Sequence, residues 1–196
     1  MTERNLKAKI QKGAFVLDGA MGTQLIARGV EAGRCNDWLN VELPNMVLDV
    51  HKAYIDAGSD AIITNTFGAN RYALGRHGCA DKAFAINKAG AQVARKAAGQ
   101  DRYVLGDIGP TGDFLEPLGM LKRDEVREAF AEQVKGLREG GVDGLIIETM
   151  TAIEELEVAI EAAKSVGGGL PVLASMSFDK GGAGFRTMME IGRAHV

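Results

Sequence analysis

The stretch 61–68, AIITNTFG, decides the fold, because a short and almost purely apolar run is followed at once by hydroxyl, amide and glycine residues. Apolar runs this short are typical of strands that are buried on both faces, as in a parallel sheet. A helical pattern precedes the run, with Pro44 in its first turn and Gly58 at its end. The order of helix, buried strand and polar loop therefore predicts an α/β fold.

Four further apolar runs show the same context, at residues 14–17, 103–105, 145–147 and 172–174. Polar or glycine-rich residues follow each run, and helical patterns lie between them. We therefore expect parallel strands joined by helical crossovers. Such a series fits an open doubly wound sheet or a (β/α)₈ TIM barrel, which normally needs about 250 residues. The first strand lacks a following Gly-x-Gly-x-x-Gly, which weakens the dinucleotide-binding version of the open sheet.

The helices after the second strand are marked by their apolar stripes. One is predicted over about residues 81–98, and the next, ending at Gly140-Gly141, buries Val126, Phe130, Val134 and Leu137. The last opens with a capping box, Thr151-x-x-Glu154, and ends in glycines 167–169. We expect this helix to bury Ile153, Leu156 and Ile160. Its acidic run (Glu154, Glu155, Glu157, Glu161) is interpreted as a solvated face.

Composition excludes several classes of protein. The chain has 196 residues, with 23 Lys and Arg against 26 Asp and Glu, a net charge of −3 and no basic run. Nucleic acid is therefore not an expected partner. Neither a signal peptide nor an apolar stretch of about 18 residues is present, so we expect no membrane association and a cytoplasmic protein.

Chemically active side chains gather where the predicted strands end. Asp18, Thr64 and Glu148 directly follow an apolar run, and Asp107 follows one after a single glycine. In a parallel fold these ends meet on one rim, where ligands bind. Two carboxylates in one pocket suit an ammonium group or acid–base work. The alternative is that the carboxylates cap helices or stabilise turns, and Asp107, within a Gly-Pro-Thr-Gly turn, best fits that alternative.

Five segments, in this order, resemble the homocysteine S-methyltransferase family. They are DGAMGT at 18–23, CND at 35–37, AGSD at 57–60, TNTFGAN at 64–70 and GDIGP at 106–110. The likeness covers about residues 13–178 and is greatest for the homocysteine-binding domains of the cobalamin-dependent branch.

The resemblance implies a (β/α)₈ barrel that binds homocysteine at the carboxyl ends of its strands and holds zinc through three cysteines. Zinc lowers the pKa of a bound thiol, so homocysteine would attack a methyl group as a thiolate. The positions that match the family's substrate ligands are Asp18 and Glu148 for the amino group, and Gly19, Ala20, Thr64 and Thr66 for the carboxylate. The implied donor is methylcobalamin charged by methyltetrahydrofolate on other domains or proteins, with betaine or S-methylmethionine as alternatives.

The chain also departs from the family. The family's zinc cysteines follow the sixth strand and lie near the end of the barrel, whereas five strands are predicted here. Cys35 and Cys79 match positions that the family does not use for metal, so we assign no metal ligand and no catalytic residue to this chain.

We therefore expect residues 1–190 to form the N-terminal portion of a barrel that is truncated after about five strand–helix units. Residues 191–196, IGRAHV, are expected to be a non-native tail, with a genuine short C-terminus as the alternative. The intact protein is expected to be a methyltransferase, and the chain alone an inactive fragment with residual amino-acid binding. A Schiff-base lyase fits poorly, because no lysine follows any of the five runs.

Overall fold

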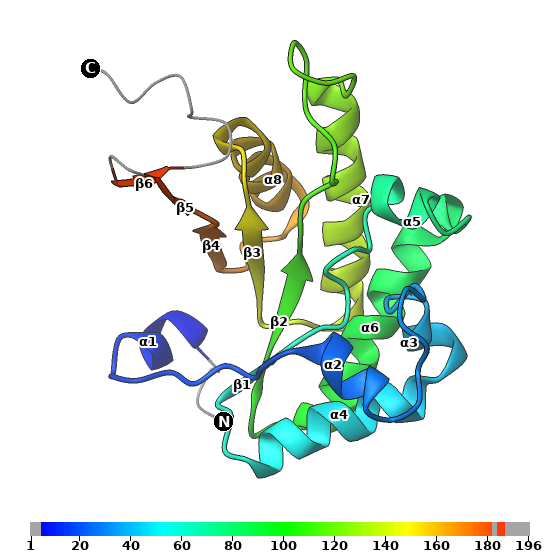
Figure 1. Ribbon diagram of the computed structural model, residues 1–196. Coiled ribbons are helices and arrows are strands. Elements are labelled where there is room, and N and C mark those ends of the chain that lie inside the picture. Colours follow the sequence, from blue (N-terminus) through cyan, green and yellow to red (C-terminus); the bar gives the residue numbers. More distant parts are fainter. Residues whose placement is uncertain (1–4, 182–183, 187–196) are drawn as a thin grey trace.

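The computed structural model describes residues 5–181 and 184–186 and has a parallel sheet at its centre. The strand order is β1 (Ala61–Ile63), β2 (Tyr103–Ile108), β3 (Gly144–Met150) and β4 (Val172–Met176). Neighbouring strands are sequential and parallel, so their carboxyl ends lie on the same side of the molecule (Figure 1). The predicted α/β class is confirmed, and four of the five predicted strands are present.

The first predicted strand, residues 14–17, is reduced to a single bridge. Leu17 pairs in parallel with Ala61, and the Asp18 N–H donates to the carbonyl of Ala61 at 3.1 Å. This segment therefore runs beside β1 without forming a full ladder, so five complete strand–helix units are not confirmed. The predicted boundary between residues 190 and 191, and the proposed tail, lie outside the described residues.

Helices occupy most of the remaining chain. They are α1 (Leu6–Ile10), α2 (Met21–Ile26), α3 (Leu39–Glu42), α4 (Pro44–Asp56), α5 (Arg71–Gly75), α6 (Ala83–Ala98), α7 (Arg123–Gly140) and α8 (Ile153–Val166), with a 3₁₀ turn η1 (Ala80–Lys82). A short antiparallel pair, β5 (Asp179–Gly181) and β6 (Gly184–Arg186), follows β4. Among the described residues, none of the helices combines the length and the apolar character needed to cross a membrane.

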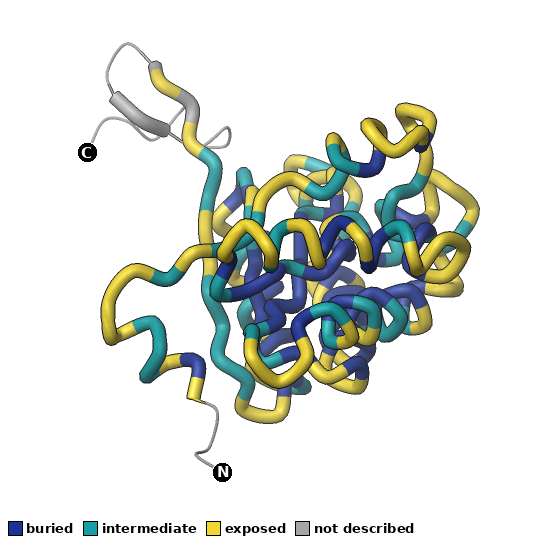
Figure 2. Tube along the Cα trace, turned by 90° about the horizontal axis from the view of Figure 1, so that it is seen from below, coloured by how far each residue is buried: buried dark blue, intermediate teal, exposed yellow. Residues whose placement is uncertain are grey.

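Helices α6, α7 and α8 cover one face of the sheet and form the largest core. Their packing agrees with the predicted stripes, since Val126, Phe130, Val134 and Leu137 of α7 are fully buried. In the tube view, buried residues gather at the centre of the molecule and the outer sides of the helices are exposed (Figure 2). Helix α7 ends where Gly141 adopts a left-handed conformation, with φ of 91°, as predicted for a glycine stop.

Helix α8 differs from its prediction at both its start and its acidic face. The residue that precedes its first turn is Ala152, without a side-chain cap, so the capping box Thr151-x-x-Glu154 does not form. Ile153 is 40% exposed instead of buried. Glu155 is buried and accepts hydrogen bonds from the N–H and hydroxyl of Thr111, both at 2.7 Å. These bonds tie the β2–α7 loop to α8, so Glu155 is not part of a solvated face.

The opposite face of the sheet has a smaller apolar cluster. Leu6 of α1 packs there with Ala61, Leu105 and Ile146, one from each of the first three strands. Because side chains alternate along a strand, Asp107 follows Leu105 on this face. On this face, apolar side chains therefore fill the part nearer the amino ends of the strands, and the predicted site lies at their carboxyl ends.

His51 of α4 is a fully buried histidine with no hydrogen-bond partner for either ring nitrogen among the described residues. Burial lowers its pKa from 6.5 to about 4. The unfolded chain therefore binds a proton that the folded chain excludes, so stability falls as the pH drops from about 6.5 to about 4. The loss amounts to roughly 3 kcal/mol.

Replacing His51 by leucine is expected to remove this part of the pH dependence of the free energy of unfolding. Urea titrations between pH 7.5 and pH 4 measure it, with the exposed His77 changed to glutamine as a control. Equal pH profiles for His51→Leu and the wild type would show that this histidine is not the group responsible.

Candidate functional site

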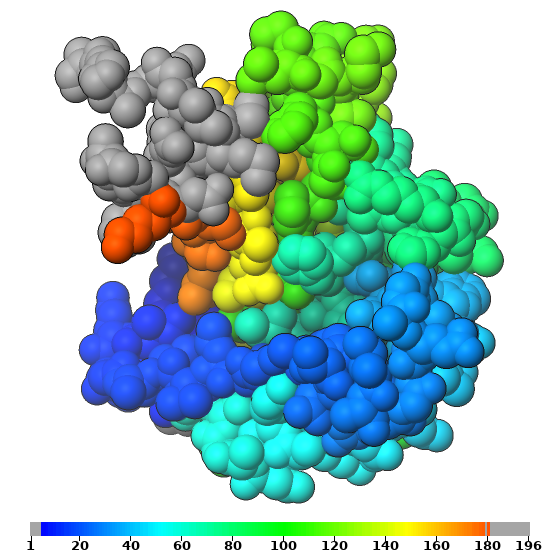
Figure 3. All heavy atoms as spheres, in the orientation of Figure 1, coloured from blue at the N-terminus to red at the C-terminus, as the bar shows by residue number. Residues whose placement is uncertain are grey.

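A cavity of about 550 Å³ lies at the carboxyl ends of β1, β2 and β3. In the space-filling view, blue residues of the N-terminal segment and teal residues that follow β1 border the yellow β3 (Figure 3). The lining comprises Asp18, Gly19, Ala20, Met21, Gly22, Arg34, Cys35, Asn36, Asp37, Ile63, Thr64, Asn65, Thr66, Phe67, Gly68, His77, Asp107 and Glu148. All six residues that sequence reasoning selected as substrate ligands are therefore brought together.

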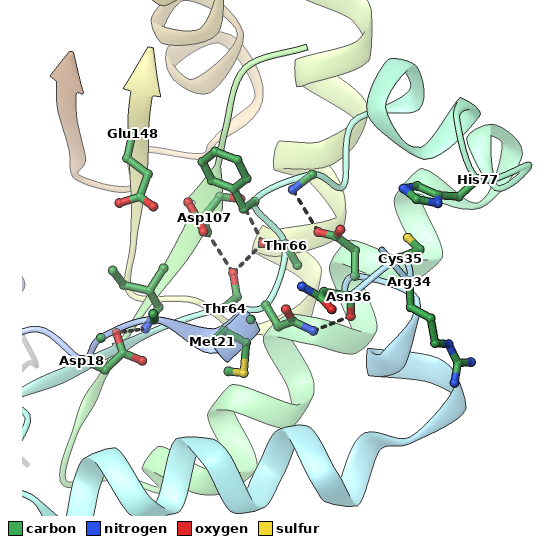
Figure 4. Close-up of a pocket in the computed structure, with 18 residues that line it drawn as sticks. Asp18, Met21, Arg34, Cys35, Asn36, Thr64, Thr66, His77, Asp107 and Glu148 are labelled. Atoms are coloured by element: carbon green, nitrogen blue, oxygen red, sulfur yellow. Dashed lines mark hydrogen bonds between the residues drawn. The ribbon is translucent and has the colours of Figure 1, made fainter. Parts of the chain in front are cut away.

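Asp18 stands before α2 and faces Glu148 across the cavity (Figure 4). Its Oδ1 accepts a hydrogen bond from the Ile63 N–H at 3.0 Å, which fixes the carboxyl against β1. It does not cap α2, since Ala20 holds that position without a side-chain bond. Burial raises the pKa of Asp18 to about 7, and the charge of Glu148 adds to the rise.

Glu148 lies near the end of β3, where the strand is irregular. The pairing of β3 with β4 shifts register between Ile147 and Met150, and Thr149 is the only described residue other than glycine with a positive φ, 61°. A bulge of this kind changes the direction of neighbouring side chains and is frequent beside functional sites. Partial burial raises the pKa of Glu148 above its usual value.

The structure corrects the interpretation of Asp107 as a turn residue. Asp107 lies inside β2 rather than in the following turn, and its side chain lines the cavity. The residue is 5% exposed, and its Oδ1 has no hydrogen-bond partner among the described residues. Burial, and then the charges of Glu148, Asp37 and Asp18, raise its pKa well above the ordinary value. Asp107 therefore belongs to the strand and lines the cavity, with one carboxyl oxygen unpaired.

Thr64 and Thr66 form a hydrogen-bonded ring with the backbone of Asp107. The Asp107 N–H donates to the Thr64 hydroxyl at 2.9 Å, the two hydroxyls lie 2.6 Å apart, and the Thr66 hydroxyl donates to the Asp107 carbonyl at 2.9 Å. Both threonines are buried. The amide of Gln133 on α7 also donates to the carbonyls of Thr66 and Asp107, at 2.8 and 3.2 Å. This network fixes the floor of the cavity to the helical layer.

Gly19 and Ala20 border the cavity through their backbone. The Tyr54 hydroxyl of α4 donates to the Ala20 carbonyl at 2.9 Å. A Cβ at position 19 would lie 3.1 Å from that hydroxyl, closer than most carbon contacts, so glycine lets the loop pass over the tyrosine. The predicted glycine-lined approach to the ligand is therefore compatible with the packing.

The far end of the cavity contains residues that sequence reasoning did not select. Asp37 accepts a hydrogen bond from the Gly68 N–H at 3.0 Å, and burial raises its pKa to about 6. Asn65 donates to the Asn36 carbonyl at 2.7 Å. The family resemblance could have indicated these residues, since 35–37 and 64–70 both belong to the segments that carry it. Asp37 was not selected as a site residue because it follows no predicted strand.

The cavity is rich in acid and poor in base. Among the described residues that line it, Arg34 is the only lysine or arginine, and it pairs with Glu42. Asp18, Asp107 and Glu148 all have raised pKa values because burial penalises their charged forms. A positively charged ligand would offset the repulsion between these carboxyl groups when they ionise, so the lining favours a cationic group such as an ammonium.

No described cluster of three His, Cys, Asp or Glu side chains could hold a metal ion. Cys35 and Cys79 are free and half-buried, and burial raises the pKa of the Cys35 thiol. A raised thiol pKa disfavours the thiolate that metal binding requires. The described residues therefore do not fit a zinc site.

Comparison with known proteins agrees with this arrangement. A family model described as homocysteine S-methyltransferase matches residues 15–194. Methionine synthase of Mycobacterium tuberculosis (strain ATCC 25618 / H37Rv) is 35% identical over 191 residues, and that of Mycobacterium leprae (strain TN) is 34% identical over 198. The alignments cover 88% and 92% of this chain but only 16% of each synthase.

Solved structures show the same fold. The homocysteine methyltransferase MmuM from Escherichia coli matches in its metallated form with a TM-score of 0.75 and 24% identity, covering 93% of this chain and 69% of that one. Its oxidized form matches with a TM-score of 0.72 and 25% identity, covering 88% and 65%. The family model spans all of the residues that line the cavity. The chain belongs to the homocysteine S-methyltransferase family.

Proposed function

We propose that this chain binds homocysteine in the cavity between Asp18, Asp107 and Glu148, and that the intact protein transfers a methyl group to the homocysteine thiol to give methionine. The observation that carries the proposal is the set of buried carboxyl groups with raised pKa values around one cavity. Asp18 and Glu148 hold the ammonium group between them. The backbone of Gly19 and Ala20, with Thr64 and Thr66 behind it, lies on the carboxylate side.

A bound zinc ion would supply the Lewis acid that makes the homocysteine thiol nucleophilic at neutral pH. The described residues do not fit that metal, so we assign no zinc ligand among them. What the described residues do is bind and orient the amino acid. Methylcobalamin and methyltetrahydrofolate on other domains or proteins are the donors that the family resemblance implies, with betaine or S-methylmethionine as alternatives.

The proposed architecture is a (β/α)₈ barrel of which the described strands are one part, in a cytoplasmic enzyme. Its support is the half-exposed β4 at the sheet edge, where Ala174 and Ser175 are exposed. In a closed barrel such an edge would be paired. The alternative is that the 196-residue chain retains amino-acid binding and has no methyl-transfer activity of its own.

Calorimetry with L-homocysteine tests the binding half of the proposal. Carboxyl groups with raised pKa values must lose their protons to bind an ammonium group, so affinity should rise as the pH is raised through about 7 and then level off. Below that pH, the affinity should rise by about tenfold for each pH unit if binding releases one proton. Asp18→Asn should bind weakly and with a flatter pH profile.

Asp56→Asn, at the exposed end of α4, is the matched control and should leave the affinity unchanged. The proposal fails if wild-type chain takes up no homocysteine. It also fails if Asp18→Asn and Asp56→Asn have the same affinity at every pH.

A further inference from the structure

The position of Asp107 in β2 places its carboxyl group below that of Glu148. In the register of the sheet, Asp107 pairs with Ile146, two residues before Glu148. Asp107 lies on the face that carries Leu105, because side chains alternate along β2, and Glu148 lines the same cavity. Asp107 therefore forms the floor of the cavity, one layer deeper than the pair that is proposed to hold the ammonium group.

The hydroxyl protons next to Asp107 are already used. The Thr66 hydroxyl donates to the Asp107 carbonyl, which can only accept. Thr66 can then only accept from Thr64, whose hydroxyl proton is directed to it across 2.6 Å. The Thr64 oxygen in turn accepts the Asp107 N–H. With all three bonds made, neither threonine has a proton left for a ligand carboxylate.

The carboxyl group of Asp107 takes no part in this hydrogen-bonded ring. Its Oδ1 is buried without a partner among the described residues, although the backbone N–H and carbonyl of the same residue are both bonded. A buried carboxylate with an unpaired oxygen is costly, and burial raises the pKa of Asp107 well above the ordinary value even though the Ile108 backbone N–H lowers it, so the neutral form is favoured. A neutral carboxylic acid carries one O–H donor.

We propose that Asp107 is a ligand-contacting residue that donates its carboxyl proton in a hydrogen bond to the carboxylate of the bound amino acid. The inference rests on the proposed function, and it identifies a donor that Thr64 and Thr66 do not supply. The threonines act as positioning residues, because their ring holds the Asp107 backbone in place. No bond is broken in this step, and the proton stays on Asp107.

The ammonium group is the less suitable partner for Asp107. Asp18 and Glu148 face each other across the cavity and supply two carboxylates for one positive charge. A third ionised carboxyl group would add repulsion without a further cation, since the only arginine of the described lining is paired with Glu42. A neutral acid avoids that repulsion and needs an anionic acceptor, which the α-carboxylate of homocysteine provides.

The experiment compares two variants with two ligands. L-homocysteine and 3-aminopropane-1-thiol have the same ammonium and thiol groups, but the second lacks the carboxylate. Asp107→Leu, without a donor, should bind homocysteine at least about tenfold more weakly, the scale of one hydrogen bond to a charged group. Asp107→Asn retains a neutral donor and should lose less than about threefold. Neither change should alter binding of 3-aminopropane-1-thiol beyond about threefold.

Infrared difference spectroscopy gives an independent readout that a structural role would not move. The wild type should show the carbonyl stretch of a protonated carboxylic acid, shifted to lower frequency when homocysteine binds and absent from Asp107→Asn. An unshifted band, or equal weakening of both ligands in Asp107→Leu, overturns the inference and leaves the homocysteine site in place. Wild-type chain that binds neither ligand overturns the proposed function itself.

Discussion

Glu148→Gln is expected to weaken homocysteine binding by about ten- to a hundredfold, the range for loss of a hydrogen bond to a charged group. Glutamine keeps the size of the side chain but cannot carry the negative charge that pairs with an ammonium group. The effect should be large because Glu148 is half-buried, where water screens the interaction less than at the surface. Calorimetry at pH 7.5, where Asp18 is largely ionised, measures it.

Glu157→Gln is the matched control, since Glu157 is an exposed residue of the neighbouring helix α8. It removes the same charge from the chain without touching the cavity. Unchanged homocysteine affinity in Glu148→Gln would remove Glu148 from the site. Equal weakening in both variants would mean that only the net charge of the chain matters.

Phe130→Ala is expected to lower the free energy of unfolding by about 3–5 kcal/mol. Phe130 of α7 is fully buried and belongs to the core between the sheet and helices α6, α7 and α8. The change removes its apolar contacts and leaves a cavity that the surrounding helices cannot fill completely. Urea unfolding monitored by circular dichroism measures the loss.

Phe114→Ala makes the same truncation in the β2–α7 loop, where the side chain is 41% exposed. We expect it to cost clearly less than Phe130→Ala, because the side chain is already partly exposed and water can occupy the space that its ring leaves. Comparable losses for the two variants would contradict the placement of α7 against the sheet.

Much of the fold could be predicted because its signals are local. Short apolar runs bounded by glycine and polar residues indicated β1 to β4, and the spacing of Val126, Phe130, Val134 and Leu137 indicated the buried face of α7. These patterns depend on residues close in sequence, whose burial follows from the period of a helix or strand.

The errors arose where distant contacts decide the outcome. Thr151 and Glu154 have the spacing of a capping box, but the chain reaches α8 directly from the irregular end of β3. In the sequence Glu155 cannot be distinguished from its exposed acidic neighbours. In the structure it accepts two hydrogen bonds from Thr111, which lies 44 residues earlier. The run 14–17 has the composition of a strand, yet it pairs only through Leu17. Sequence patterns carry no information about such long-range partners.

The site was predicted in outline because strand ends in parallel folds converge. That principle placed Asp18, Thr64 and Glu148 on one rim, and the family resemblance implied their roles as ligands; all three line one cavity. Asp107 was interpreted as a turn residue because Gly109-Pro110 follows closely. Its role depends on β2 continuing to Ile108 and on the proton order of the threonine ring, neither of which spacing alone reveals.

A crystal structure of the 196-residue chain with L-homocysteine would show where the amino acid binds. We expect ligand density in the 550 Å³ cavity at the carboxyl ends of β1 to β3. The ammonium group should lie between Asp18 and Glu148, with the carboxylate within hydrogen-bond distance of Asp107. Homocysteine bound elsewhere, or bound in this cavity with its carboxylate between Asp18 and Glu148, would contradict it.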